Sequence, residues 1–260
     1  MSEVICKAIH GDRFSGLFSR DFAWEHGVMC RLSIFFVAAI SCLFSPPLHA
    51  GETGKSILNS RCVSCHNLKG PAPVTLAALW KRKGPDLFYA GNKYKHDWLV
   101  SWLQKPERIR PAGMFYRDHI KPGPKHDVVD ASTLKPHVSL NKRDATAVAD
   151  ALMTFKANSN LVASEKLIPA PTPIGEMMFD KIYGCMACHQ IEPGYGGMSG
   201  SEAYTAGKRL QASFMLSYIK NPQAWDPKIW MPNKHVPADN IQQLVNYLID
   251  LSKEDFSDEQ

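Results

Sequence analysis

The chain has 260 residues, of which 45% are hydrophobic and 21% are charged. This composition is ordinary for a globular protein and excludes an intrinsically disordered one, and the length suits two domains of about 100 to 150 residues each. The formal net charge is +5, and there are seven cysteines.

The segment Met29–Ala50 has the pattern of a secretory signal peptide. Arg31 supplies the positive start, residues 32–44 are largely apolar, and we expect cleavage after Ala50. A membrane anchor needs about 20 apolar residues, so this run is short for one. We predict that translation starts at Met29, that residues 1–28 are not translated, and that the mature protein is periplasmic. The alternatives are a genuine extension with an uncleaved anchor, and a lipoprotein signal at Cys42, which fits less well.

Four of the cysteines form two Cys-x-x-Cys pairs, and each pair is followed at once by a histidine. The motifs are Cys62, Cys65 and His66, and Cys185, Cys188 and His189. At the start of a helix this spacing places both sulfurs on one face, where they can add to the two vinyl groups of haem, and the next residue directs its imidazole at the iron. Cys-x-x-Cys-His is the signature of c-type haem attachment. We therefore predict two covalently bound haem c groups, with His66 and His189 as iron ligands.

Zinc ribbons and thioredoxin-like dithiols also use paired cysteines. A zinc ribbon places its second pair about 15 to 20 residues after the first, whereas Cys185 follows Cys62 by 123 positions. A thioredoxin motif lies in a β-α-β unit, whereas the sequence around these cysteines predicts helices. Haem attachment is the interpretation that fits the spacing.

A repeat offset by 116 positions relates two parts of the chain. Gly91–Pro106 aligns with Gly207–Pro222, and bulky side chains recur there at helical spacing. In both copies a proline then stops the helix. Each copy closes with a predicted amphipathic helix, at residues 144–155 and 240–251. The expected N-cap residues of these helices are Asn141 and Asp239.

These features predict a domain at residues 51–157 and another at residues 173–260, after an N-terminal extension and signal peptide at residues 1–50. Residues 158–172 form a proline-rich linker, which we expect to be stiff and extended. The first domain carries an insertion at residues 115–140, which we expect to act as a docking loop or a lid.

A low-spin haem needs a sixth iron ligand, and Met/His ligation raises its reduction potential. Met231, which precedes a proline, is the candidate in the second domain, and Met114 is the candidate in the first. The insertion also contains His119, His126 and His137 as substitutes for Met114.

With these features the sequence resembles the class I cytochrome c domain, repeated in tandem as in di-haem c-type cytochromes. The resemblance covers nearly all of residues 51–254. Besides the two haem motifs and the two methionines, it rests on Gly84-Pro85, on the Trp98/Trp102 helix and on the Phe214/Tyr218 helix. It implies an all-α fold in which a few helices wrap each haem and one haem edge is exposed.

The resemblance also implies partners for the two histidines. The carbonyl of Pro85 is expected to accept a hydrogen bond from His66, and residues 194–200 are expected to substitute for it at His189, where the Gly-Pro pair is missing. Haem attachment in this family takes place outside the cytoplasm, in keeping with the predicted export.

The charge is distributed unevenly. Residues 51–160 contain 18 Lys and Arg against 9 Asp and Glu, whereas residues 161–260 contain 8 against 12. Opposite charges predict two docking surfaces, one for an electron donor and one for an electron acceptor. A membrane-bound oxidase or dehydrogenase is a candidate for such a partner. Alternatively, the charges only hold the two domains together. Export and haem argue against a nucleic-acid partner despite the basic run at residues 81–83.

We predict electron transfer by two haems, as a periplasmic shuttle or as the cytochrome subunit of a respiratory redox complex. The alternative is a haem enzyme, peroxidase-like or acting on a small molecule, with an open or labile axial site in the first domain. A haem-based sensor is a third hypothesis. A methionine candidate in each copy favours a carrier over an enzyme.

Overall fold

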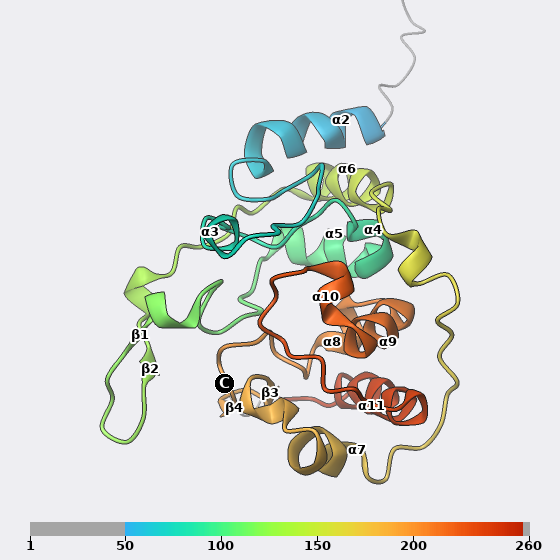
Figure 1. Cartoon of the computed structure of the whole chain (residues 1–260). Coiled ribbons are helices and arrows are strands. Elements are labelled where there is room, and N and C mark those ends of the chain that lie inside the picture. Colours follow the sequence, from blue (N-terminus) through green and yellow to red (C-terminus); the bar gives the residue numbers. More distant parts are fainter. Residues whose placement is uncertain (1–49, 257–260) are drawn as a thin grey trace, which may run out of the picture. The chain divides into compact units, whose positions relative to one another are not determined.

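The computed structural model describes residues 50–256, which are mostly helical with few short strands (Figure 1). Nearly all of the predicted signal segment and everything before it lie outside the described residues. None of the helices within residues 50–256 combines the length and the apolar character needed to cross a membrane.

The N-terminal half (residues 50–157) is built around a helix crossing. Its helices are α2 (Ala50–Ile57), which continues as the π-helical η1 (Leu58–Cys62), then α3 (Leu76–Leu79), α4 (Ala90–Lys93), α5 (His96–Gln104) and α6 (Lys142–Met153). Helix α6 packs against α2 and α5 (Figure 1). A Cβ atom on Gly54 would lie only 1.9 Å from the carbonyl oxygen of Ala147. The crossing of α2 and α6 therefore requires glycine at this position.

The C-terminal half (residues 173–256) repeats this plan. Its helices are α7 (Gly175–Met177), which continues as η5 (Met178–Ile182), then η6 (Cys185–Ala187), α8 (Ala206–Arg209), α9 (Ala212–Lys220), α10 (Pro222–Trp225) and α11 (Ala238–Leu251). Gly175 again faces the closing helix, because a Cβ atom there would lie 2.6 Å from the Cβ atom of Tyr247. Phe179, Leu244 and Leu248 are buried between these elements.

The helices predicted from the repeat are confirmed. Helices α5 and α9 have nine residues each, start 116 positions apart, and end two residues before a proline. The short helices α4 and α8 show the same offset. The two closing helices start two residues earlier than predicted.

One of the two expected helix caps is confirmed and the other is wrong. Asn141 caps α6, since its Oδ1 accepts the backbone N–H of Asp144 at 2.9 Å. Asp239 instead lies inside the first turn of α11, and Pro237 is the N-cap residue. A carboxylate in the first turn still interacts favourably with the helix dipole.

Equivalent residues of the two halves meet each other. Tyr94 and Leu210, which are 116 positions apart, form an antiparallel bridge. Two flanking backbone hydrogen bonds, each 2.9 Å long, run in opposite directions: Lys95 N–H to Arg209 O, and Gln211 N–H to Lys93 O. Because each bond is the counterpart of the other under the 116-residue offset, the junction has a local twofold character.

Side chains extend the same junction. Lys95 Nζ donates to the carbonyl of Gly207 at 2.6 Å, and Gln211 Nε2 donates to the carbonyl of Gly91 at 2.8 Å. These donors and acceptors are again equivalent positions of the repeat. A buried aromatic cluster that includes Phe88, Tyr89, Phe214 and Trp225 also contains residues from both halves.

Two short hairpins accompany the helices, and the mostly helical structure is compatible with the predicted all-α class. In the insertion, η2 (Tyr116–Asp118) is followed by a hairpin of β1 (Ile120–Lys121) and β2 (Val128–Val129), and then by η3 (Ala131–Thr133). A second hairpin, β3 (Gln190–Glu192) and β4 (Tyr195–Gly196), comes directly after His189. Gly194 and Gly196 have φ values of 79° and 112°, so the reversal relies on glycine.

The proline-rich segment lies against α11. It follows η4 (Ser159–Leu161) and has no regular secondary structure from residue 165 to 172. Ile168 N–H donates to Gln242 Oε1 at 2.9 Å, and Asn246 Nδ2 donates to the carbonyl of Ile168 at 2.9 Å. The segment is thus held to the C-terminal half by side-chain hydrogen bonds. The predicted domain boundaries themselves stay a prediction.

Candidate haem sites

The first motif forms a tight turn at the end of η1. The backbone N–H groups of Cys65 and His66 both donate to the carbonyl of Cys62 at 3.0 Å. Cys62 is partly buried, Cys65 is exposed, and neither forms a disulfide. The turn therefore places both thiols and the imidazole in one short segment.

The carbonyl of Pro85 holds His66, as predicted. Nδ1 of His66 lies 2.8 Å from this oxygen, so Nδ1 carries the proton and the lone pair is on Nε2. Burial is the largest influence on the pKa of His66 and lowers it, although the hydrogen bond acts in the opposite direction. A Cβ atom on Gly84 would lie 2.6 Å from Cε1 of His66, so glycine is required beside the ring. A neutral, oriented imidazole is the form that binds metals.

The second motif has the same arrangement with a different acceptor. His189 N–H donates to the carbonyl of Cys185 at 3.1 Å, and Nδ1 of His189 lies 2.6 Å from the carbonyl of Ser201. A Cβ atom on Gly200 would lie 2.7 Å from the His189 ring. Burial again lowers the pKa of this histidine.

Sequence reasoning missed Ser201, which lies one residue beyond the segment expected to replace Pro85. The signal was present, because Gly84-Pro85 and Gly200-Ser201 are 116 positions apart, the same offset as the helices. A main-chain carbonyl can accept the hydrogen bond whatever the side chain. A Gly-Pro pair is therefore not required for this hydrogen bond, since the main-chain carbonyl of Ser201 accepts it.

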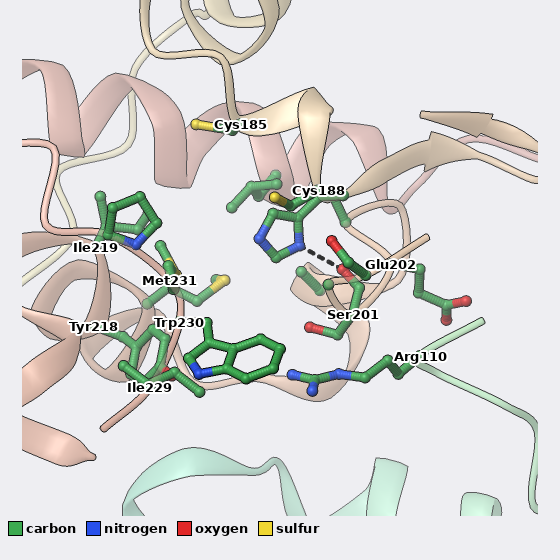
Figure 2. Close-up of a pocket in the computed structure, with 18 of the residues that line it drawn as sticks. Arg110, Cys185, Cys188, Ser201, Glu202, Tyr218, Ile219, Ile229, Trp230 and Met231 are labelled. Carbon is green, nitrogen blue, oxygen red and sulfur yellow. Dashed lines mark hydrogen bonds between the residues drawn. The ribbon is translucent and has the colours of Figure 1, made fainter. Parts of the chain in front are cut away.

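A cavity of about 320 Å³ adjoins the second motif. Cys185, Cys188 and His189 line it together with Met231, and Figure 2 shows Met231 across the cavity from Cys188. Apolar side chains form much of the remaining wall, among them Phe179, Phe214, Met215, Ile219, Leu244 and Leu248. The structure thus brings the predicted ligands His189 and Met231 to one cavity.

Met114 lines the same cavity, although it was predicted to serve the first motif. Its carbonyl accepts a hydrogen bond from Arg110 Nη1 at 3.0 Å. The pocket that contains Cys65 and His66 does not include Met114 in its lining. The structure therefore places Met114 on the wall of the cavity that His189 and Met231 also line.

Cationic side chains from both halves reach the cavity wall. Arg82, Lys93 and Arg110 come from the N-terminal half, and Arg209 comes from the C-terminal half. Burial lowers the pKa values of Arg110 and Arg209. Arg209 is anchored by donating from Nη2 to the carbonyl of Glu202 and from Nε to Thr205. Glu202 lines the same cavity, so its wall carries charged groups of both signs.

Arg82 also joins the two halves through a buried ion triad. It contacts Asp86 at 2.9 Å and Asp226 at 2.5 Å, and the three side chains are only 8%, 3% and 5% exposed. Burial lowers the pKa of Arg82, but the two carboxylates more than offset this and raise it overall. Burial raises the pKa of Asp86, against the opposing charge of Arg82.

An aromatic cluster lies next to Met231. Trp230 contacts Trp80 and Phe115, with ring centroids 4.9 Å and 6.1 Å away. The guanidinium of Arg117 lies 3.7 Å from the Trp80 ring. The start of the insertion therefore packs against the residue that precedes Met231.

The three histidines of the insertion have different surroundings. His119 makes a hydrogen bond of 2.9 Å with Thr133, and the side chain of His126 is exposed. His137 is exposed too, but its ring centroid lies 6.0 Å from that of His66 and 4.7 Å from that of Trp102. Among the three, His137 alone has a ring that contacts the ring of His66 within the part of the chain that the structure describes.

Residues 50–256 contain no group of three or more His, Cys, Asp or Glu side chains arranged to hold a metal ion. No protein-family model and no solved structure matches the chain. Over 89 residues the chain is 29% identical to cytochrome c-551 of Allochromatium vinosum (strain ATCC 17899 / DSM 180 / NBRC 103801 / NCIMB 10441 / D). The matched region is 32% of this chain and 92% of that protein. This similarity points weakly to a c-type cytochrome.

Proposed function

We propose that the chain is an electron carrier that binds two haem c groups, one at Cys62, Cys65 and His66 and the other at Cys185, Cys188 and His189. The observation that carries the proposal is the repeated histidine site. Both motif histidines donate from Nδ1 to a main-chain carbonyl, and both rings pack on a glycine that has no room for a Cβ atom. The similarity to cytochrome c-551 supports the c-type cytochrome part of the proposal.

Both motifs keep free thiols, and at the second motif the cavity wall also fits such a group. The four motif cysteines are free, and each pair is close enough in sequence to form two thioether bonds to one porphyrin. The cavity at the second motif, about 320 Å³, falls within the range of about 300 to 1,000 Å³ that is typical of cofactor pockets. Its wall combines apolar side chains with Arg110 and Arg209, which suits a planar apolar ring that carries two carboxylates.

The haem would supply an iron that cycles between the ferric and ferrous states. The chain's own residues would set the conditions for that exchange. His189 and Met231, which line one cavity, would bind the iron, and the carbonyl of Ser201 would orient the imidazole of His189. The buried arginines Arg110 and Arg209 would balance the propionates, and the apolar wall would exclude water, so that electron transfer needs little rearrangement.

We place the protein in the periplasm, on the predicted signal segment and on the chemistry of haem attachment. The excess of basic residues in 51–160 and of acidic residues in 161–260 supports two docking surfaces for different redox partners. A membrane-bound oxidase or dehydrogenase is one such partner. The protein would act as a soluble shuttle or as a subunit of a respiratory complex.

A haem count and a reduced-state absorption spectrum, with and without carbon monoxide, test the proposal on the purified mature protein. We expect two haems per chain and no change on adding carbon monoxide, because both irons are six-coordinate. The Cys62→Ala/Cys65→Ala and Cys185→Ala/Cys188→Ala variants should each retain one covalent haem. Fewer than two haems in the unmodified protein would overturn the proposal. Ready carbon monoxide binding would favour the haem-enzyme alternative.

A further inference from the structure

A histidine of the insertion lies beside His66. The ring of His137 lies with its centroid 6.0 Å from that of His66, and the two ring planes are inclined by 58°. Trp102, on α5, contacts His137 with a centroid separation of 4.7 Å and supports it from the side. An exposed loop histidine is thus held at a defined distance from the histidine of the haem motif.

The two rings have matching hydrogen bonds. Nδ1 of His66 lies 2.8 Å from the carbonyl of Pro85, and Nδ1 of His137 lies 2.8 Å from the carbonyl of Val138. A carbonyl only accepts, so both Nδ1 atoms carry a proton, and Nε2 is the ring nitrogen that is left to face a metal. A main-chain carbonyl on the far nitrogen is the usual orienting partner of a metal-bound histidine.

The ring separation matches that of two imidazoles on one metal. A metal–imidazole nitrogen bond is about 2.0 Å, and the ring centre lies about 1.1 Å behind that nitrogen, so two rings on opposite sides of one metal have centres about 6.2 Å apart. The observed 6.0 Å agrees with this value. Of the other candidates, Met114 lines the cavity of the second motif, and neither His119 nor His126 has a ring contact with His66 among the described residues.

We propose that His137 is the second axial ligand of the haem bound at Cys62, Cys65 and His66. The proposal rests on the proposed function and refines it: one haem has two histidine ligands and the other has His189 and Met231. Since methionine ligation raises the potential of a haem, the haem of the N-terminal half has the lower potential. The insertion at residues 115–140 then has a definite role, which is to deliver this ligand.

The test uses the holoprotein and its His137→Ala and His137→Met variants. Near-infrared magnetic circular dichroism of the ferric protein distinguishes bis-histidine from histidine–methionine ligation. We expect one haem of each type in the unmodified protein. His137→Ala should let one of the two haems bind carbon monoxide, and His137→Met should raise the midpoint potential of one haem. His137 is exposed, so neither substitution should impair folding.

His119→Ala, a second histidine of the same insertion, is the matched control and should change neither spectrum nor potential. Met114→Leu should likewise leave both haems closed to carbon monoxide. Two histidine–methionine spectra in the unmodified protein, or a His137→Ala variant that excludes carbon monoxide, would overturn the inference. In both cases two six-coordinate haems would remain, and the proposed function would stand. Loss of a haem from the unmodified protein would instead defeat the proposed function itself.

Discussion

Replacing Arg82 by methionine should destabilise the folded protein, because Arg82 is the centre of the ion triad that joins the two halves. The substitution keeps most of the apolar stem and removes the guanidinium. It leaves Asp86 and Asp226 buried without their counter-ion, at 3% and 5% side-chain exposure. Removing one partner of a buried ion pair costs about 3 to 5 kcal/mol. We expect a loss of this size in the free energy of unfolding.

The loss should depend on pH in a definite direction. Burial raises the pKa of Asp86, and the charge of Arg82 opposes this increase. A carboxyl group whose folded-state pKa is raised contributes stability that is present at low pH and is lost as the pH rises through that pKa. Without Arg82 the pKa of Asp86 rises further. The deficit of Arg82→Met relative to the unmodified protein should therefore shrink as the pH falls from neutral towards about 5.

Guanidinium denaturation of the holoprotein, followed by far-ultraviolet circular dichroism and by haem absorption, measures both quantities. Coincident transitions from the two probes would justify a two-state treatment. Lys253→Met is the control, since it breaks an exposed pair with Asp250, 2.7 Å long, and should cost less than about 0.5 kcal/mol. A deficit below about 1 kcal/mol for Arg82→Met, or one that does not vary with pH, would refute the reasoning.

Three further predictions concern the haem sites. Gly200→Ala should displace the ring of His189, because a Cβ atom at position 200 would lie 2.7 Å from that ring. The yield of covalent haem at the second motif should therefore fall. The control Ser201→Ala keeps the accepting carbonyl and should leave this yield unchanged. Met231→Ala should let one haem bind carbon monoxide and should lower its midpoint potential, and spectra indistinguishable from those of the unmodified protein would exclude Met231 as a ligand. If the basic and acidic segments steer docking, stopped-flow reduction by a purified acidic redox partner should slow as ionic strength rises, and a rate independent of salt would contradict this.

Local patterns in the sequence predicted much of the fold. The 116-residue repeat placed α5 and α9 correctly, because bulky residues at helical spacing followed by proline leave few alternatives. Asn141 was correctly recognised as a cap from its residue type. Asp239 was chosen for the same reason, but the N-cap of α11 is Pro237, two residues earlier, whose side chain carries no capping group. The short hairpins were missed, since strands of two or three residues carry no periodic signal.

The candidate sites were also predicted only where a local sequence pattern marks them. The carbonyl of Pro85 was predicted because it lies in a recognisable sequence segment, whereas that of Ser201 was missed because any residue type supplies a carbonyl. Met114 was assigned to the first motif by its order along the chain. The structure shows that a residue of one half can line the cavity of the other, which depends on packing between distant segments. The same packing places His137, rather than His119 or His126, beside His66.

The junction between equivalent residues has a consequence for how the two sites can differ. Two identical subunits that met through the same reciprocal bonds, Lys95 to Arg209 and Gln211 to Lys93, would form a homodimer in which every substitution appears twice. In a single chain each half can change without the other. The covalent tether also makes the pairing of the halves independent of protein concentration. The junction can then stay symmetric while the sites it supports become unlike. An insertion on one side only, such as residues 115–140, is a difference that a true homodimer cannot encode.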